Sequence, residues 1–312
     1  MNAGRDAARV VRSGGTDLPL AAKAVAVQGA SEPVRRILVG LLGRGIQASR
    51  TPAMHEAEGE ALQIPYVYRL LDADRMGQVV LGDLVDQAER FGFDGLNVTY
   101  PYKQEILPFL TDLSDAAKAL GSVNTVVFRD GRRFGHNTDM WGFKQSLNEG
   151  LPGAPRKTVL LIGAGGAGAA VAYALLDGGA NQVLIHDTLQ DSAEALAARL
   201  GRQFGGNRAT VAADLSAAAA KTDGIVNATP VGMAKLPGTP IDPKLLRAEC
   251  WVVDIVYFPL ETQFLAQARR RGCRTLGGQG MAVYQAVRAF ELFTGIKPDI
   301  DRMKAAFAAY GN

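Results

Sequence analysis

The stretch Thr158-Val-Leu-Leu-Ile-Gly-Ala-Gly-Gly-Ala-Gly168 decides the fold class of this chain. A short apolar run is typical of a buried strand in a parallel sheet, and glycines at three fixed positions follow it at once. Gly163 permits a tight turn, Gly165 lets a phosphate approach the backbone, and Gly168 allows close helix–strand packing. The pattern predicts a turn that binds a dinucleotide at a helix N-terminus, and the alternative is a tight strand-to-helix turn without a ligand.

A carboxylate follows at the distance expected for ribose binding. The next predicted strand, residues 182–187, ends in Asp187, about 20 residues further on, where an acid bonds the adenine ribose hydroxyls. Asp187 could instead cap the helix that begins near Leu189. Residues 188–192 contain no Arg or Lys that could hold a 2′-phosphate. The sequence therefore favours NAD as cofactor, with NADP as the less favoured choice.

A second informative stretch is Gly95-Leu-Asn-Val-Thr-Tyr-Pro-Tyr-Lys103. It predicts a short buried strand that ends before Pro101, because proline has no N–H and restricts the residue before it. Lys103 then opens a helix predicted over residues 104–110. A lysine at such a corner, with Asn97 and Thr99 just before it, suits proton transfer to a small polar ligand. The alternative is a surface lysine without a functional role.

An acidic residue could complete such a site. Asp139 ends the stretch Arg133-Phe-Gly-His-Asn-Thr-Asp139, and a helix is predicted from Met140. Asp139 could be the N-cap of that helix, which is a usual role for aspartate. It could also be an acid directed at Lys103, since the two stretches place each partner at a separate rigid end.

Length and composition indicate a globular enzyme with two domains. The chain has 312 residues, of which 47% are hydrophobic and 21% charged, values typical of a folded enzyme. The net charge is only +3, and no basic stripe with interleaved aromatic residues indicates a nucleic-acid partner. No apolar run is long enough to span a membrane. The two cysteines and three histidines lack metal-ligand spacing, so we expect no metal and a cytoplasmic location.

Strands and helices alternate along the chain from residue 37. This alternation predicts an α/β protein whose parallel sheets carry helices on both faces. Residues 1–36 have no clear periodicity and are interpreted as a flexible extension. The predicted strands are residues 37–43, 66–71, the run before Pro101, 158–162, 182–187, and the segments around 224–232 and 251–257, with a hairpin of 122–128 and 133–136 across Asp130-Gly131.

Eight short blocks, in this order, resemble the shikimate dehydrogenase family, and most closely its NAD-linked quinate/shikimate dehydrogenases. The resemblance covers roughly residues 37 to 310. The blocks are Ser49-Arg-Thr-Pro-Ala-Met-His-Glu56, Gly95–Lys103, Gly121-Ser-Val-Asn-Thr125, His136-Asn-Thr-Asp139, Gly163-Ala-Gly-Gly-Ala167, Asn227-Ala-Thr-Pro-Val-Gly-Met233, Asp254-Ile-Val-Tyr257 and Gly280-Met-Ala-Val-Tyr-Gln285.

The resemblance implies an N-terminal αβ substrate domain, a C-terminal Rossmann-like NAD(P)-binding domain and a cleft between them. We expect residues 37–138 plus 281–312 in the first domain and 139–280 in the second. Lys103 and Asp139 would be the catalytic pair. The implied substrate contacts are Ser49, Thr51, Thr99, Asn124, Tyr257 and Gln285, and the implied cofactor contacts are Gly163, Ala164, Gly165, Gly166, Ala167, Asp187, Gly278 and Met281.

The implied reaction is oxidation of a ring hydroxyl of quinate or shikimate. Ser49 and Thr51 would hold the substrate carboxylate, and Lys103 would act as general base, or as a charged donor that stabilises an alkoxide. NADP-linked members carry Asn-Arg-Thr where this chain has His186-Asp187-Thr188, which agrees with NAD. Thr51, where many biosynthetic members have Ser, resembles the quinate-accepting branch.

Other functions remain open at this stage. The chain could be a biosynthetic shikimate dehydrogenase or an aminoshikimate dehydrogenase. A nucleotide-sensing regulator without turnover could keep the same fold, although the presence of Lys103 and Asp139 disfavours it. We expect a small-molecule substrate, neither nucleic acid nor membrane as partner, and a monomer or homodimer.

Overall fold

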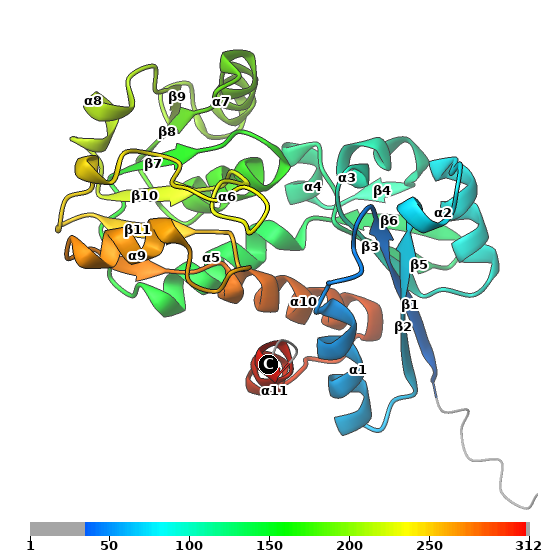
Figure 1. Ribbon diagram of the computed structural model, residues 1–312. Coiled ribbons are helices and arrows are strands. Elements are labelled where there is room, and N and C mark those ends of the chain that lie inside the picture. Colours follow the sequence, from blue (N-terminus) through cyan, green and yellow to red (C-terminus); the bar gives the residue numbers. More distant parts are fainter. Residues whose placement is uncertain (1–34, 310–312) are drawn as a thin grey trace, which may run out of the picture. The chain divides into compact units, whose positions relative to one another are not determined.

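The structure is a computed structural model that describes residues 35–309. The predicted flexible extension, residues 1–36, lies outside the described residues except for its last two positions. Two six-stranded sheets organise the described part of the chain (Figure 1).

The first sheet is mixed and has the strand order β2-β1-β3-β5-β6-β4. Its first three strands are parallel, whereas β5 runs antiparallel to β3 and pairs with β6 in a hairpin. The hairpin that the sequence predicted across Asp130-Gly131 is confirmed, and both turn residues have positive φ, which is typical of two-residue hairpin turns. The strands are β1 Ile37–Gly43, β2 Tyr66–Asp72, β3 Gly95–Val98, β4 Asp112–Leu113, β5 Thr125–Arg129 and β6 Arg132–His136.

The second sheet is wholly parallel, with the order β12-β11-β10-β7-β8-β9. Strands β8 and β9 follow β7 on one side of the sheet, and β10 to β12 follow on its other side, so the strand order reverses between β7 and β10. Doubly wound sheets bind nucleotides at such a switch point. The apolar run of β7 is buried on both faces, as expected for a central parallel strand. The strands are β7 Thr158–Ile162, β8 Gln182–His186, β9 Ala209–Val211, β10 Gly224–Asn227, β11 Trp251–Asp254 and β12 Arg274–Leu276. The predicted α/β fold with a Rossmann-like sheet is confirmed.

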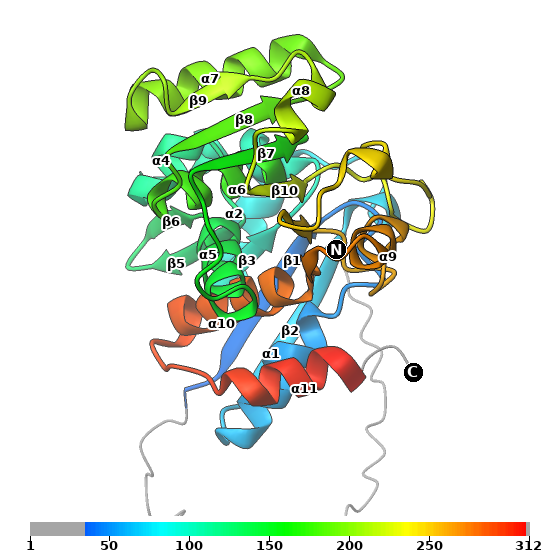
Figure 2. The same cartoon turned by 90° about the vertical axis from the view of Figure 1, so that its left-hand side faces the viewer.

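The last two helices return to the first sheet (Figures 1 and 2). Val287 and Phe290 of α10 pack in one buried cluster with Val39 of β1 and Tyr66 of β2. Helix α11 lies against α1, and α10 also packs on α5. The helices are α1 Thr51–Ala61, α2 Leu81–Arg90, α3 Tyr102–Glu105, α4 Asp115–Leu120, α5 Thr138–Gly150, α6 Gly166–Asp177, α7 Gln190–Phe204, α8 Leu215–Ala219, α9 Gln263–Arg270, α10 Gln279–Thr294 and α11 Ile300–Ala309.

One predicted helix is wrong. The sequence predicted a helix over residues 104–110, but α3 covers only Tyr102–Glu105 and is followed by a 3₁₀ turn, Leu107–Phe109. Pro108 lacks the N–H that the next α-helical hydrogen bond needs, so the helix cannot continue. Lys103 therefore lies inside a single helical turn that directly follows β3.

Candidate active site

Lys103 and Asp139 meet at the carboxyl ends of the strands of the first sheet. The Lys103 Nζ donates to Asp139 Oδ2 at 2.6 Å. Lys103 stands in α3, after β3, and Asp139 stands in the first turn of α5, after β6. The two side chains are 23% and 11% exposed, so the pair is largely buried but still open to a small ligand. The structure thus brings together the two residues that the sequence singled out.

Asp139 is not the N-cap of its helix. Asn137 holds that position, and its Oδ1 accepts a hydrogen bond from the Met140 backbone N–H at 3.2 Å. The N-cap interpretation of Asp139 is therefore wrong. The carboxylate instead lies within the first helical turn, where the unpaired N–H groups of a helix favour negative charge. This leaves both oxygens of Asp139 available to side chains.

Asn124 holds the other oxygen of Asp139. Its Nδ2 donates to Asp139 Oδ1 at 2.9 Å and to Thr138 Oγ1 at 2.9 Å. The Asn124 Oδ1 accepts the Thr138 backbone N–H at 2.7 Å, so the amide can have only this orientation. Asn124 was predicted from its motif, whereas Thr138 was missed although it belongs to the same quoted block as Asp139.

The Ser49–Thr51 segment lies at the start of α1. Ser49 Oγ donates to Thr51 Oγ1 at 3.2 Å, so the two hydroxyls are neighbours. Between them, Arg50 is only 8% exposed and donates to the Phe307 carbonyl at 2.9 Å. Its guanidinium lies 4.8 Å from the Phe307 ring centroid and 5.9 Å from that of Phe258. Arg50 was not predicted as a site residue, because its only signal in the sequence is a charge between two candidate donors.

Tyr257 lies near the same residues. Its ring packs edge-on against Phe307, with 5.9 Å between the centroids. Burial raises the pKa of the Tyr257 hydroxyl, while the positive charge of Lys103 partly opposes the shift. The hydroxyl is therefore a neutral hydrogen-bond donor at physiological pH.

Thr99 and Gln285 have no direct bond to the pair. The Thr99 backbone N–H donates to the Leu42 carbonyl at 2.9 Å, which fixes the end of β3 next to β1. Gln285 projects from α10 and donates to the Ala282 carbonyl at 3.0 Å. Among the hydrogen bonds of residues 35–309, none joins either side chain to Lys103 or Asp139. Their roles as substrate contacts stay predictions.

The glycine turn after β7 has the backbone that the sequence predicted. Gly163 has φ +107°, a conformation that favours glycine. A Cβ at Gly168 would lie 2.0 Å from the Gly163 carbonyl oxygen, so only glycine allows this packing. A Cβ at Gly165 or Gly166 would meet nothing within 4 Å. The space beside Gly165 and Gly166 at the N-terminus of α6 is therefore open. A pyrophosphate could reach the backbone N–H groups there, including those of Ala164 and Ala167.

Asp187 joins this turn to the end of β8. Its Oδ2 accepts the Ala164 backbone N–H at 2.7 Å, and its Oδ1 accepts the Leu189 N–H at 2.9 Å. The carboxylate thus bonds the chain just before α7, whose N-cap position is held by Leu189 itself. A small pocket of about 100 Å³ opens beside it, lined by Ile162, His186, Asp187, Thr188, Thr229, Val231 and Pro240.

Gly278 and Met281 stand at the start of α10. A Cβ at Gly278 would lie 2.1 Å from the Ile255 carbonyl oxygen, which requires glycine at this approach to β11. Met281 is buried in the core cluster that includes Val253 and Leu161 of the parallel sheet. Both residues therefore lie at the end of that sheet, and their contact with a nicotinamide stays a prediction.

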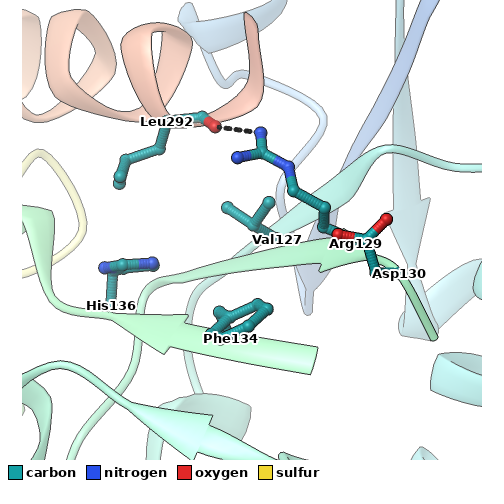
Figure 3. A pocket seen from close by; sticks show the side chains of 6 residues that line it. All are labelled: Val127, Arg129, Asp130, Phe134, His136 and Leu292. Carbon is teal, nitrogen blue, oxygen red and sulfur yellow. Dashed lines mark hydrogen bonds between the residues drawn. The ribbon is translucent and has the colours of Figure 1, made fainter. Parts of the chain in front are cut away.

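A larger pocket lies away from these residues. A cavity of about 280 Å³ lies between the β5–β6 hairpin and α10. Figure 3 shows the side chains that line it. It is lined by Val127, Arg129, Asp130, Phe134, His136 and Leu292, none of which was a predicted site residue. In residues 35–309, no group of three or more His, Cys, Asp or Glu is arranged to hold a metal ion. No helix of this described part is long and apolar enough to cross a membrane.

Comparison with known proteins places the chain among dehydrogenases. Residues 41–126 match the shikimate dehydrogenase substrate binding domain, residues 147–236 the shikimate / quinate 5-dehydrogenase family, and residues 278–306 the shikimate 5'-dehydrogenase C-terminal domain. A shikimate dehydrogenase (NADP(+)) of Streptomyces avermitilis is 52% identical, with 87% of this chain and 94% of the relative covered. A quinate/shikimate dehydrogenase (NAD(+)) of Corynebacterium efficiens is 50% identical, with 87% and 97% covered.

Solved structures agree with these relatives. Quinate dehydrogenase from Corynebacterium glutamicum in complex with NAD superposes with a TM-score of 0.84 at 46% identity, covering 88% of this chain and 99% of that one. A shikimate 5-dehydrogenase from Thermus thermophilus in complex with NADP(H) and shikimate gives a TM-score of 0.76 at 34% identity, covering 88% and 99%. This chain belongs to the shikimate dehydrogenase family.

Proposed function

We propose that this protein is an NAD-dependent dehydrogenase that interconverts quinate or shikimate with the 3-dehydro ketone. The observation that carries the proposal is the bond of 2.6 Å between Lys103 and Asp139, with Tyr257 nearby, in a chain of this family. The similarity to the Corynebacterium enzymes supports both the reaction and the substrates.

In the proposed reaction, the residues of the first sheet bind and orient the substrate. The hydroxyls of Ser49 and Thr51 donate to the substrate carboxylate, with Thr99, Asn124, Tyr257 and Gln285 as further contacts. When bound, the nicotinamide supplies the hydride acceptor. Lys103 takes the proton from the reacting hydroxyl oxygen as the adjacent carbon loses hydride, and returns it in the reduction. Asp139 holds the lysine in place through its Oδ2.

We assign the dinucleotide site to the residues around the glycine turn. The backbone of residues 163–167 would hold the pyrophosphate, Asp187 the ribose, and Gly278 with Met281 the nicotinamide side. We keep the domain division predicted from the sequence. Residues 37–138 plus 281–312 would bind the substrate, and residues 139–280 would bind the cofactor.

The choice of NAD rests on charge. A 2′-phosphate placed at Asp187 would meet a carboxylate, and no Arg or Lys stands among residues 188–192 to compensate. The Streptomyces relative, whose name specifies NADP(+), is the observation in favour of the second candidate, a biosynthetic shikimate dehydrogenase.

Steady-state kinetics with quinate and shikimate, each with NAD and NADP, tests the proposal. We expect turnover with at least one of the two acids and a higher kcat/KM with NAD than with NADP. Absence of turnover with both acids would refute the function. Equal efficiency with the two cofactors would refute the role of Asp187, and a preference for shikimate with NADP would favour the second candidate.

A further inference from the structure

A series of hydrogen bonds between buried polar side chains leads from β2 to Asp139 of the catalytic pair. Tyr68 of β2 donates its hydroxyl to Asn97 Oδ1 at 2.7 Å, and Asn97 Nδ2 lies 3.0 Å from Thr125 Oγ1. Thr125 donates to Asn124 Oδ1 at 3.2 Å, and Asn124 donates to Asp139 at 2.9 Å. Tyr68, Asn97, Thr125 and Asn124 are each at most 5% exposed, so water does not replace these contacts.

Two backbone groups fix the orientation of the two amides in this network. Asn97 Nδ2 also lies 3.3 Å from the Asn124 carbonyl, which can only accept, so the Asn97 oxygen must face Tyr68. Asn124 Oδ1 accepts the Thr138 backbone N–H, so its amine must face Asp139. Thr125 accepts from Asn97, and we assign its own proton to the shorter of its two other contacts, Asn124 Oδ1 at 3.2 Å, rather than to Thr138 Oγ1 at 3.4 Å. All donors therefore point from β2 towards Asp139.

When all hydrogen bonds in a series point the same way, each donor polarises the next group. The last hydrogen bond of the series is therefore strengthened. The last bond is the one from Asn124 to Asp139 Oδ1, opposite the oxygen that holds Lys103. The chain also limits how far the Asn124 amide can turn, since both of its ends are engaged. Asn97 is a polar residue in a strand whose four residues are all buried, where apolar residues are the usual choice.

We propose that Tyr68, Asn97 and Thr125 are positioning residues for proton transfer, which hold the Asn124 amide and thereby fix the Asp139 carboxylate against Lys103. The inference rests on the proposed function and extends it to three residues that were not predicted as substrate or cofactor contacts. Its alternative is a polar network that only satisfies buried groups and stabilises the fold.

The test compares Thr125→Val, Thr125→Ser and Thr222→Val. Valine keeps the shape of threonine but removes the hydroxyl, whereas serine restores it. Thr222 is the matched control, since it is 1% exposed and its hydroxyl bonds the Ala219 carbonyl in the second sheet's half of the chain. For the wild type and each variant we would measure kcat, KM, the Kd of NAD, the solvent deuterium isotope effect and the melting temperature.

We expect Thr125→Val to lower kcat about tenfold, the effect of one weakened hydrogen bond in the transition state, with KM and the Kd of NAD within about twofold. The solvent isotope effect on kcat should increase, because proton transfer becomes slower. Thr125→Ser should recover most of kcat, and Thr222→Val should lose comparable stability at unchanged kcat. Wild-type kcat in Thr125→Val, or no recovery in Thr125→Ser, would overturn the proposal.

A second measurement does not need turnover. In the wild type, NMR should show the Asn124 side-chain amide protected from exchange with water, and Tyr68→Phe, which removes only the first hydroxyl, should speed that exchange. If the Asn124 side-chain amide exchanges at the same rate in Tyr68→Phe as in the wild type, the proposed coupling along this series of hydrogen bonds is wrong. If the wild type oxidises neither acid while this protection is observed, the proposed reaction fails and the positioning role in proton transfer fails with it, although the hydrogen-bond network itself is present.

Discussion

Asp187 shows how one carboxylate constrains the choice of ligand. Its two oxygens hold the Ala164 and Leu189 backbone N–H groups, so it can neither turn away nor be displaced without leaving both amides unpaired. A hydroxyl of a ribose can share such a carboxylate as a donor, whereas a phosphate cannot. Under the proposed assignment of Asp187 to the ribose, we expect this residue and its immediate neighbours to set the preference between the two pyridine nucleotides.

We expect Asp187→Asn to reduce the preference for NAD over NADP by about tenfold, since it removes a negative charge next to the 2′ position. The measurement is the ratio of kcat/KM for the two cofactors. Asp191→Asn is the matched control, because it removes the same charge from an exposed site in the first turn of α7. An equal change in both variants would contradict a specific role for Asp187.

At the scale of elements, the strand–turn–helix of β7 and α6 depends on one close approach. Gly168→Ala should abolish NAD binding or folding, because its Cβ would lie 2.0 Å from the Gly163 carbonyl oxygen. Calorimetric titration with NAD and a melting curve test both outcomes. Gly206→Ala, where a Cβ meets nothing within 4 Å, should behave as the wild type. Wild-type binding and stability of Gly168→Ala would show that the turn has another geometry.

Arg50 joins three elements that are far apart in the sequence. It stands before α1, bonds the Phe307 carbonyl of α11, and faces Phe258 in the segment after β11. Arg50→Lys should lower the free energy of unfolding by about 1 to 2 kcal/mol, because lysine loses the planar contact with two rings. Urea denaturation measures the change, and Arg90→Lys at an exposed helix end is the control. An unchanged midpoint for Arg50→Lys would exclude this contribution.

The sequence predicted those elements that have strong local signals. Glycine spacing and an apolar run predicted β7 and α6, and Asp130-Gly131 predicted the hairpin of β5 and β6. The helix over 104–110 failed because Pro108 outweighed the apolar pattern on either side. Arg50 and Thr125 were not found, because their roles come from contacts between distant elements. Asn97 was noted beside Lys103, but its bonds to Tyr68 and Thr125 could not be read from the sequence. The register of β3 against β5, which pairs Asn97 with Thr125, is a property of the folded sheet.

At the scale of the whole molecule, α10 closes the core of the first sheet over a buried histidine. His55 of α1 is fully buried among Tyr66, Tyr68 and Phe290, and its Nδ1 lies 2.8 Å from the Tyr66 hydroxyl. Burial lowers the pKa of His55 to about 3. The unfolded chain takes up a proton at this residue near pH 6.5, whereas the folded chain does not until pH about 3.

The unfolded state therefore binds more protons between these two pH values, and the free energy of unfolding falls as the pH falls. From pH 6.5 to pH 4, His55 alone should remove about 3 kcal/mol. Urea denaturation at the two pH values measures the loss. His55→Gln, which does not titrate, should show a smaller loss over the same range, and an equal loss in both proteins would contradict this account.

The central claim is that Lys103, held by Asp139, moves the proton of the reacting hydroxyl. The most direct measurement is kcat of Lys103→Ala together with the Kd of NAD, with Lys118→Ala, whose side chain is 63% exposed, as control. We predict that Lys103→Ala lowers kcat by a factor of about 10² or more, while the Kd of NAD changes by less than about threefold and Lys118→Ala behaves as the wild type. A kcat of Lys103→Ala close to the wild-type value would contradict the claim.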